Sequence, residues 1–137
     1  MAACSIVIPT KNRPQMLRRA VLAGLQASAP DGEVVVIDDH SEVPASEVLA
    51  DLGCARLRVV RNAGDPGAAG ARNHGAAVAK GEILFFADDD DEIFPDYVGE
   101  IVTYARGRDA ARFGFSLTVR AEDGQPHKMM RTRLGPG

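Results

Sequence analysis

The chain has 137 residues, of which 45% are hydrophobic and 26% charged, and its net charge is -3. These values are typical of a soluble globular protein, and we expect a single domain over residues 1–137. Aromatic residues make up only 5% and tryptophan is absent. With neither a basic balance nor aromatic platforms for stacking bases, the composition argues against nucleic acid as a partner.

The two cysteines, Cys4 and Cys54, lack any metal-type spacing, so we expect both to be reduced thiols. No apolar stretch approaches the roughly 20 residues that a membrane-spanning helix needs. The first residues show no basic region of the kind that opens a signal peptide. We therefore expect a cytoplasmic chain without a transmembrane segment, and leave open a peripheral association with the membrane.

Strand-like and helix-like patterns alternate along the chain. Apolar runs predict strands at 4–8, 33–37, 57–60 and 82–86, and helical spacing predicts helices from Pro14 onward and over 47–52, 66–80 and 95–106. Segments 113–120 and 127–131 read as a hairpin. The order βαβαβαβα predicts an α/β, Rossmann-type fold with a mostly parallel sheet and helices on both faces.

Four consecutive aspartates, Asp88 to Asp91, follow directly on the apolar run 83–87, which reads as a buried strand. Carboxylates this close repel one another, and a divalent cation would remove that cost. Their hard oxygen ligands suit Mg²⁺ or Mn²⁺. A solvated acidic turn is the alternative interpretation of such a run. The position at a strand's carboxyl end favours a ligand site.

Two other loops are expected at the same edge of the sheet, at 9–13 and 38–41, with Arg72 nearby. A carboxylate after the second strand can accept hydrogen bonds from a nucleobase or a ribose, and Arg72 can pair with phosphate oxygens. Together with a cation at the aspartate run, these groups predict a nucleoside diphosphate site. Taken singly, Asp38 or Asp39 could only cap a turn, and Arg72 could be a surface residue.

The segment Gly64 to Gly70 offers a competing interpretation, because it follows a strand and opens a helix. An acidic cluster some twenty residues further on is also found in dinucleotide-binding folds. The glycine spacing, however, is G-x-x-G-x-x-G, and Pro66 stands where the tight turn should be. A dinucleotide-binding domain therefore remains an alternative only.

Four ordered segments, 5–13, 35–41, 62–73 and 80–95, carry a resemblance to a known family. They read Ser-Ile-Val-Ile-Pro-Thr-Lys-Asn-Arg, then Val-Val-Ile-Asp-Asp-His-Ser, then Asn-Ala-Gly leading to Gly-Ala-Arg-Asn, and finally Lys-Gly-Glu-Ile-Leu-Phe-Phe-Ala followed by the four aspartates. In order and spacing the chain resembles the family 2 glycosyltransferases with the GT-A fold.

The resemblance implies a nucleotide-sugar donor, with a UDP-sugar favoured. The first loop would wrap the nucleotide with Pro9, Thr10, Asn12 and Arg13. Asp39, and less directly Asp38, would read the base, which is usually uracil. Arg72 would lie near the diphosphate.

Asp88, Asp89 and Asp90 are similar to the D-x-D motif of that family. The resemblance implies that Asp90 contacts the metal, and that Asp88 serves both the sugar-ribose side and the metal. Asp89 is grouped with the donor-binding residues, although it could be only a spacer. Asp91 matches a frequent extra acid without a fixed role.

The implied reaction transfers a sugar from the donor to an acceptor hydroxyl, with a carboxylate base activating the acceptor. The acceptor is not named by the sequence, and no base stands in the expected context after the aspartate run. We therefore expect the chain to lack the acceptor-binding half and to be apparently truncated, which could expose an edge for homo-oligomerisation. A non-catalytic nucleotide-binding or interaction module on the same scaffold is the other hypothesis.

Overall fold

The computed structural model describes residues 4–28, 30–95, 97–105, 117–120 and 126–130. The chain forms two compact units, Met1–Thr103 and Tyr104–Gly137, and each is described by itself. The expectation of one domain over the whole length therefore stays a prediction.

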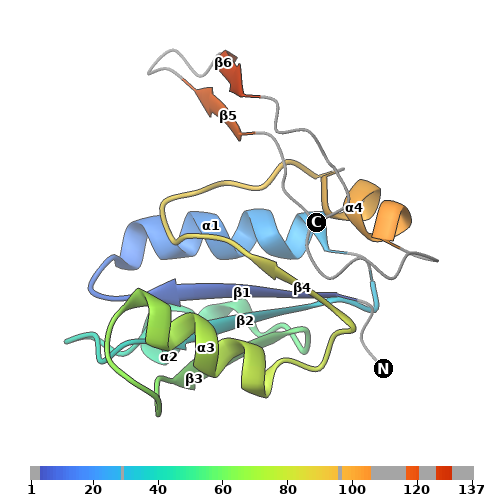
Figure 1. The fold of residues 1–137 in the computed structure, drawn as a ribbon. Coiled ribbons are helices and arrows are strands. Elements are labelled where there is room, and N and C mark those ends of the chain that lie inside the picture. The colour runs from blue at the N-terminus through green and yellow to red at the C-terminus, as the bar shows by residue number, and fades with distance from the viewer. Residues whose placement is uncertain (1–3, 29, 96, 106–116, 121–125, 131–137) are drawn as a thin grey trace. The chain divides into compact units, whose positions relative to one another are not determined.

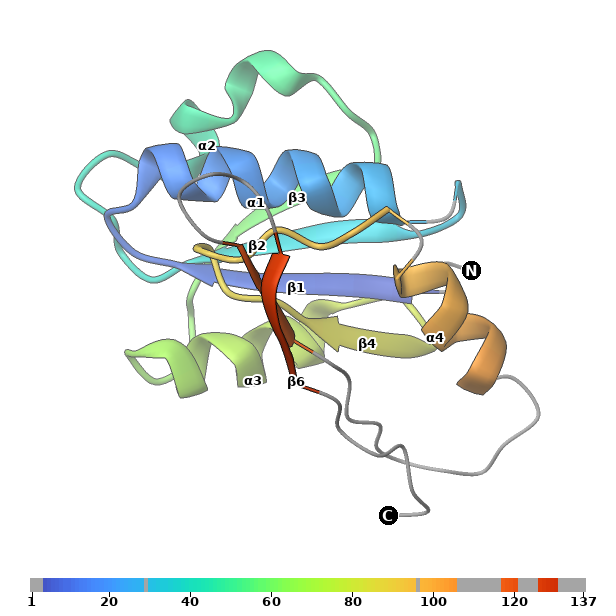
Figure 2. The same cartoon turned by 90° about the horizontal axis from the view of Figure 1, so that it is seen from above.

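The first unit contains a parallel sheet in which the strand order is β3-β2-β1-β4. The strands are β1 (Cys4–Thr10), β2 (Glu33–Asp38), β3 (Leu57–Arg61) and β4 (Ile83–Phe86). Figure 2 looks down on this sheet and shows the strands side by side. All four predicted strands are confirmed, with ends displaced by at most two residues. From β1 the chain adds β2 and β3 on one side, and it then adds β4 on the other side of β1. The strand order thus switches between β1 and β4, and ligands bind beside such a switch point in open α/β sheets.

Helices cover both faces of the sheet, as predicted (Figure 1). They are α1 (Pro14–Ala27), α2 (Ala45–Val48), a 3₁₀ turn η1 (Ala50–Leu52), α3 (Ala68–Val78) and α4 (Tyr97–Ala105). One face of the central strands packs Ile6 and Val34 against α1, α2 and α4. Val7 and Val35 point to the other face, where they pack against α3. The alternation follows from the two-residue period of a strand.

The small residues of α3 allow the helix to lie close to the sheet. A Cβ atom at Gly75 would come 2.3 Å from Cγ1 of Val7, a separation that packed carbon atoms do not reach. The helix therefore lies close against the sheet. This packing fixes the distance from the sheet of Arg72, which lies about one turn earlier on the same helix, near the carboxyl edge of the sheet.

The predicted start of this helix at Pro66 is wrong, because α3 begins at Ala68 after an N-cap at Gly67. Gly67 has a φ of 98°, a conformation that suits glycine and not the start of a helix. Two contacts hold the segment in this shape: Asn62 Nδ2 donates to the carbonyl of Asp65, and the Gly67 N–H donates to Asp39 Oδ2.

The expectation that the apolar run 83–87 is a buried strand holds only for part of its residues. Phe85 is buried, but Leu84 and Phe86 are 37% and 41% exposed. β4 ends the described sheet, and α3 packs mainly on β1 and β2, which fits the partial exposure of these two side chains. Association of copies of the chain through such apolar surface stays a prediction.

At the amino edge of the sheet, Glu33 joins three strands through a buried carboxylate. It accepts hydrogen bonds from Ser5 Oγ at 2.6 Å, the Lys80 N–H at 2.7 Å and Arg58 Nε at 2.9 Å. Burial alone would raise the pKa of Glu33, but these donors together lower it. The connection into β4 is thereby fixed at the end opposite the candidate site.

The second unit contains the predicted hairpin, formed by β5 (Leu117–Arg120) and β6 (Pro126–Met130) in antiparallel pairing. The first residues of the expected strand 113–120 lie outside the described part of the chain. Among the helices that the structure describes, none is long and apolar enough to cross a membrane.

Candidate functional site

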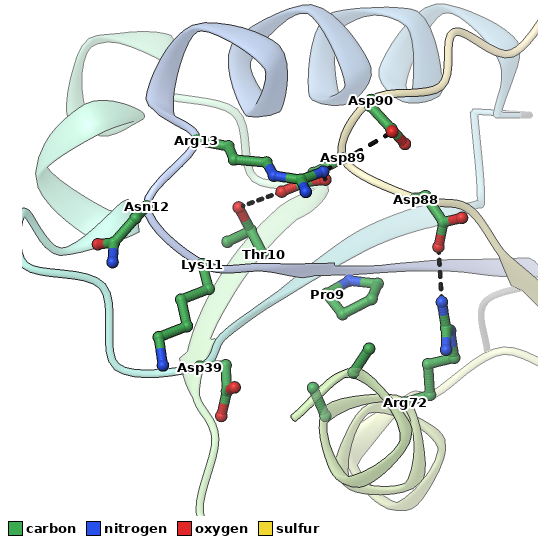
Figure 3. A pocket seen from close by; sticks show the side chains of 12 residues that line it. Pro9, Thr10, Lys11, Asn12, Arg13, Asp39, Arg72, Asp88, Asp89 and Asp90 are labelled. Carbon is green, nitrogen blue, oxygen red and sulfur yellow. Dashed lines mark hydrogen bonds and ion pairs between the residues drawn. The ribbon is translucent and has the colours of Figure 1, made fainter. Parts of the chain in front are cut away.

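Three loops and the start of α3 surround a cavity of about 490 Å³ at the carboxyl edge of the sheet. Figure 3 shows the side chains that converge on it. The lining residues are Pro9, Thr10, Lys11, Asn12, Arg13, Asp39, Ala68, Ala71, Arg72, Asp88, Asp89 and Asp90. All the site residues predicted from the sequence line the cavity, except Asp38. The cavity is also lined by Lys11, Ala68 and Ala71, which the sequence analysis did not select. Their functional roles remain predictions.

Asp38 is not among the residues that line the cavity, and it organises the loop that follows β2. Its Oδ1 accepts the Ser41 N–H at 3.0 Å, and its Oδ2 accepts the Ala45 N–H at 2.8 Å. Burial opposes ionisation of this group, but the hydrogen bonds prevail and lower its pKa. Both carboxylate oxygens are thus used within the loop, which fits the turn-capping alternative for Asp38.

Asp39 lines the cavity, and its carboxylate is also held on both oxygens. Oδ1 accepts from Asn62 Nδ2, and Oδ2 accepts from the Gly67 N–H, both at 2.9 Å. These two bonds lower its pKa, so the group is an anion. Each oxygen can accept a second hydrogen bond. Lys11 extends toward Asp39 in Figure 3, which brings a cation to this end of the cavity.

The contact between Asp39 and Gly67 also bears on the dinucleotide alternative. A phosphate-binding glycine loop offers its backbone N–H groups to the ligand. Here the N–H of Gly67 donates to Asp39, and that of Gly64 donates to Asn62 Oδ1 at 3.0 Å. These two backbone N–H groups are therefore already bound within the protein and are not available to a phosphate.

The loop after β1 is fastened to the loop after β2 by Asn12. Its own N–H donates to Ser41 Oγ at 2.9 Å, and its side-chain Oδ1 accepts from the Glu42 N–H at 2.8 Å. Asn12 has a φ of 54°, a left-handed conformation that asparagine tolerates better than most residues. Its contacts are structural, and they set the shape of the first loop around the cavity.

Asp89 fastens the same loop to the aspartate run. Its side chain is 8% exposed and accepts hydrogen bonds from Thr10 Oγ1 at 2.9 Å and Arg13 Nη1 at 3.2 Å. Figure 3 shows it between these two residues. Asp89 thus anchors the first loop, and no local pattern could reveal this contact, because the partners are more than seventy residues away in the chain.

Asp88, Asp90 and Asp91 are exposed and form the cluster that could hold a cation. One carboxylate oxygen of each lies within 4.8 Å of the others, the sole such group in the part of the chain that the structure describes. Burial, followed by the charges of Asp88 and Asp90, raises the pKa of Asp91. An all-oxygen anionic donor set fits Mg²⁺ or Mn²⁺. Asp91 joins the two metal ligands expected from the sequence.

Two arginines reach this cluster from different elements. Arg72 Nη2, on α3, donates to Asp88 Oδ1 at 2.7 Å. Arg13 Nη1, in the first loop, lies 3.7 Å from Asp90 Oδ2. The site therefore combines cations that suit phosphate oxygens with carboxylates that suit a metal.

Comparison with known proteins matches residues 5–134 to the family model described as Glycosyl transferase family 2. Among curated relatives, the succinoglycan biosynthesis protein ExoU of Rhizobium meliloti is 39% identical over 100 residues. That match covers 72% of this chain but 29% of the relative. The chain thus spans less than a third of that protein's length.

Solved structures show the same fold. Staphylococcus aureus TarS 1-349 in complex with UDP aligns with a TM-score of 0.65 at 21% identity, over 94% of this chain and 46% of that one. The mannosyltransferase PcManGT from Pyrobaculum calidifontis, in complex with GDP-Man and Mn²⁺, aligns with a TM-score of 0.69 at 22% identity, over 78% and 33%. The predicted GT-A-like architecture is confirmed. The chain belongs to glycosyl transferase family 2.

Proposed function

We propose that this chain is the donor-binding portion of a metal-dependent glycosyltransferase, and that its donor is a nucleotide-diphospho-sugar, with a UDP-sugar favoured. The observation that carries the proposal is one cavity bordered by Asp39 at one end and by the exposed aspartates and Arg72 at the other. Its volume is within the range of pockets that hold small organic ligands. UDP in TarS and GDP-Man in PcManGT, on the same fold, support a nucleotide ligand.

Asp39 would accept a hydrogen bond from an N–H of the base. Its two internal donors fix the orientation of the carboxylate, so it meets the base without reorganising. Uracil offers one such N–H beside two carbonyl oxygens, and Lys11, which lines the same cavity, would donate to one of them. Ala68 and Ala71 leave room on the α3 side of the cavity.

Asp88 and Asp90 would hold Mg²⁺ or Mn²⁺, with Asp91 within reach. A bound divalent cation supplies Lewis-acid stabilisation of the departing diphosphate. Arg72 and Arg13 would bind phosphate oxygens, adding charge-assisted hydrogen bonds to the same leaving group. The Mn²⁺ that accompanies GDP-Man in PcManGT supports a metal-dependent site.

Transfer of the sugar to an acceptor hydroxyl is proposed for the whole protein to which this portion corresponds. The proposal assigns donor binding to the described residues, and it assigns neither the catalytic base nor the acceptor. A non-catalytic binding module predicts the same nucleotide affinity without transfer or donor hydrolysis. Product analysis with a UDP-sugar therefore separates the two functions, because released UDP would count against the binding module.

The direct test is calorimetry of UDP binding with Mn²⁺ and with a chelator. We expect binding that depends on Mn²⁺ and is lost in Asp90→Ala. Asp51→Ala is a matched control, because it also removes one exposed carboxylate, which pairs with Arg18 outside the cavity. Absence of UDP binding by the wild type would sink the proposal, and binding that survives both chelation and Asp90→Ala would sink the metal assignment.

A further inference from the structure

The carboxylates that the proposed metal would need are already paired with arginines of the protein itself. Arg72 Nη2 lies 2.7 Å from Asp88 Oδ1. Arg13 Nη1 lies 3.2 Å from Asp89 Oδ1 and 3.7 Å from Asp90 Oδ2. The two guanidinium groups come from the first loop and from α3, and Figure 3 shows both turned toward the aspartate run. They act as internal counter-ions of the acidic cluster.

A cation bound to Asp88 and Asp90 would meet these arginines at close range. The metal and Arg72 would compete for the same oxygen of Asp88, and their positive charges would repel. Both arginines also line the cavity, so a diphosphate bound there offers them new partners of the geometry that guanidinium prefers. Each arginine thus has two alternative anionic partners within reach of one side chain.

We propose that Arg13 and Arg72 exchange partners on donor binding, leaving the aspartates for the diphosphate as the metal takes their place. The inference rests on the proposed function and deepens it. Metal alone must displace the arginines without compensation, whereas a diphosphate removes them from the carboxylates. Metal and nucleotide therefore favour each other's binding beyond their direct contact, and the coupling is reciprocal.

The test measures Mn²⁺ affinity in the absence of nucleotide, from the free Mn²⁺ signal in electron paramagnetic resonance. Arg72→Gln removes one counter-ion, and Arg18→Gln is the control. Arg18 also pairs with an aspartate at 2.7 Å and its side chain is 39% exposed, as is that of Arg72. Both variants lower the net charge of the protein by the same amount, so the long-range attraction of the protein for Mn²⁺ changes equally in the two.

We expect Arg72→Gln to bind Mn²⁺ alone about fivefold more tightly than the wild type, because an exposed ion pair and a nearby like charge are both removed. The same variant should bind UDP in the presence of Mn²⁺ about tenfold more weakly, through the loss of a charge-assisted hydrogen bond. Arg13→Gln should shift both affinities in the same directions by less, since its contact with Asp90 is longer. Arg18→Gln should change neither.

An unchanged or weakened affinity of Arg72→Gln for Mn²⁺ alone would overturn the proposed exchange. That result is expected if Arg72 only binds phosphate, or only holds the loop in place. This outcome is distinguishable from failure of the proposed function. If the wild type does not bind UDP, the proposed function fails, while the comparison with Mn²⁺ alone still decides whether Arg72 shields the aspartates.

Discussion

Asp89 joins the first loop to the aspartate run through a carboxylate that is buried, while the other three aspartates are exposed. Its bond from Thr10 has a charged acceptor and is buried, and such bonds contribute about 1.5–3 kcal/mol. Its bond from Arg13 is worth less than about 1 kcal/mol, because the Arg13 side chain is 52% exposed and solvent screens the pair. We expect Asp89→Ala to lower the free energy of unfolding by about 2–3 kcal/mol.

Double-mutant cycles measured by urea denaturation separate the two bonds. The cycle of Asp89→Ala with Thr10→Val should give a coupling energy of about 1–2 kcal/mol, because valine keeps the shape of threonine without its hydroxyl. The cycle with Arg13→Gln should give about 0.5 kcal/mol. A Thr10 cycle that is additive within about 0.5 kcal/mol, or an Arg13 coupling that exceeds the Thr10 coupling, would refute this account of how the site is held.

Two further predictions concern the scaffold. Glu33→Gln should lower the free energy of unfolding at pH 7 by roughly 1–3 kcal/mol, because an amide cannot accept from all three donors. The folded-state pKa of Glu33 lies below its ordinary 4.5. Its contribution to stability is therefore present above pH 4.5 and is lost as the pH falls through the folded pKa. The difference in unfolding free energy between wild type and variant, measured by urea denaturation, should shrink on acidification, and a constant difference would contradict this. Gly75→Ala should cost about 1–3 kcal/mol, because its Cβ would collide with Val7. Gly99→Ala is the control, because a Cβ atom at Gly99 would meet nothing within 4 Å. Alanine inside a helix should stabilise the protein by about 0.5–1 kcal/mol relative to glycine. Equal effects of Gly75→Ala and Gly99→Ala on the thermal midpoint would contradict the packing argument.

The strands and the fold class could be predicted because continuous apolar runs and turn residues are local signals. The start of α3 could not, since the conformation of Gly67 depends on the side chains of Asp39 and Asn62, which approach it only in the folded chain. The exposure of Phe86 was also missed. A run of apolar residues does not show which strand lies at the edge of a sheet or which strands a helix covers.

The candidate site was predictable as a location more than as a set of roles. Strand-end position placed the selected residues at the edge of the sheet where the cavity lies, and all of them except Asp38 line it. Adjacent residues in extended chain point in opposite directions, and the sequence alone could not tell that Asp38 turns into its own loop while Asp39 faces the cavity. The same limit applies to Asp89, whose partners Thr10 and Arg13 are distant in sequence.

The central claim is that nucleotide and metal bind together at the carboxyl edge of this sheet. Paramagnetic broadening of backbone amide signals by Mn²⁺, recorded with UDP present, tests it most directly. The account predicts broadening that centres on residues 88–91 and extends to 10–13 and 71–73, and that disappears in Asp90→Ala. Broadening centred elsewhere, for instance at the exposed Asp51, or persisting in that variant, would contradict it.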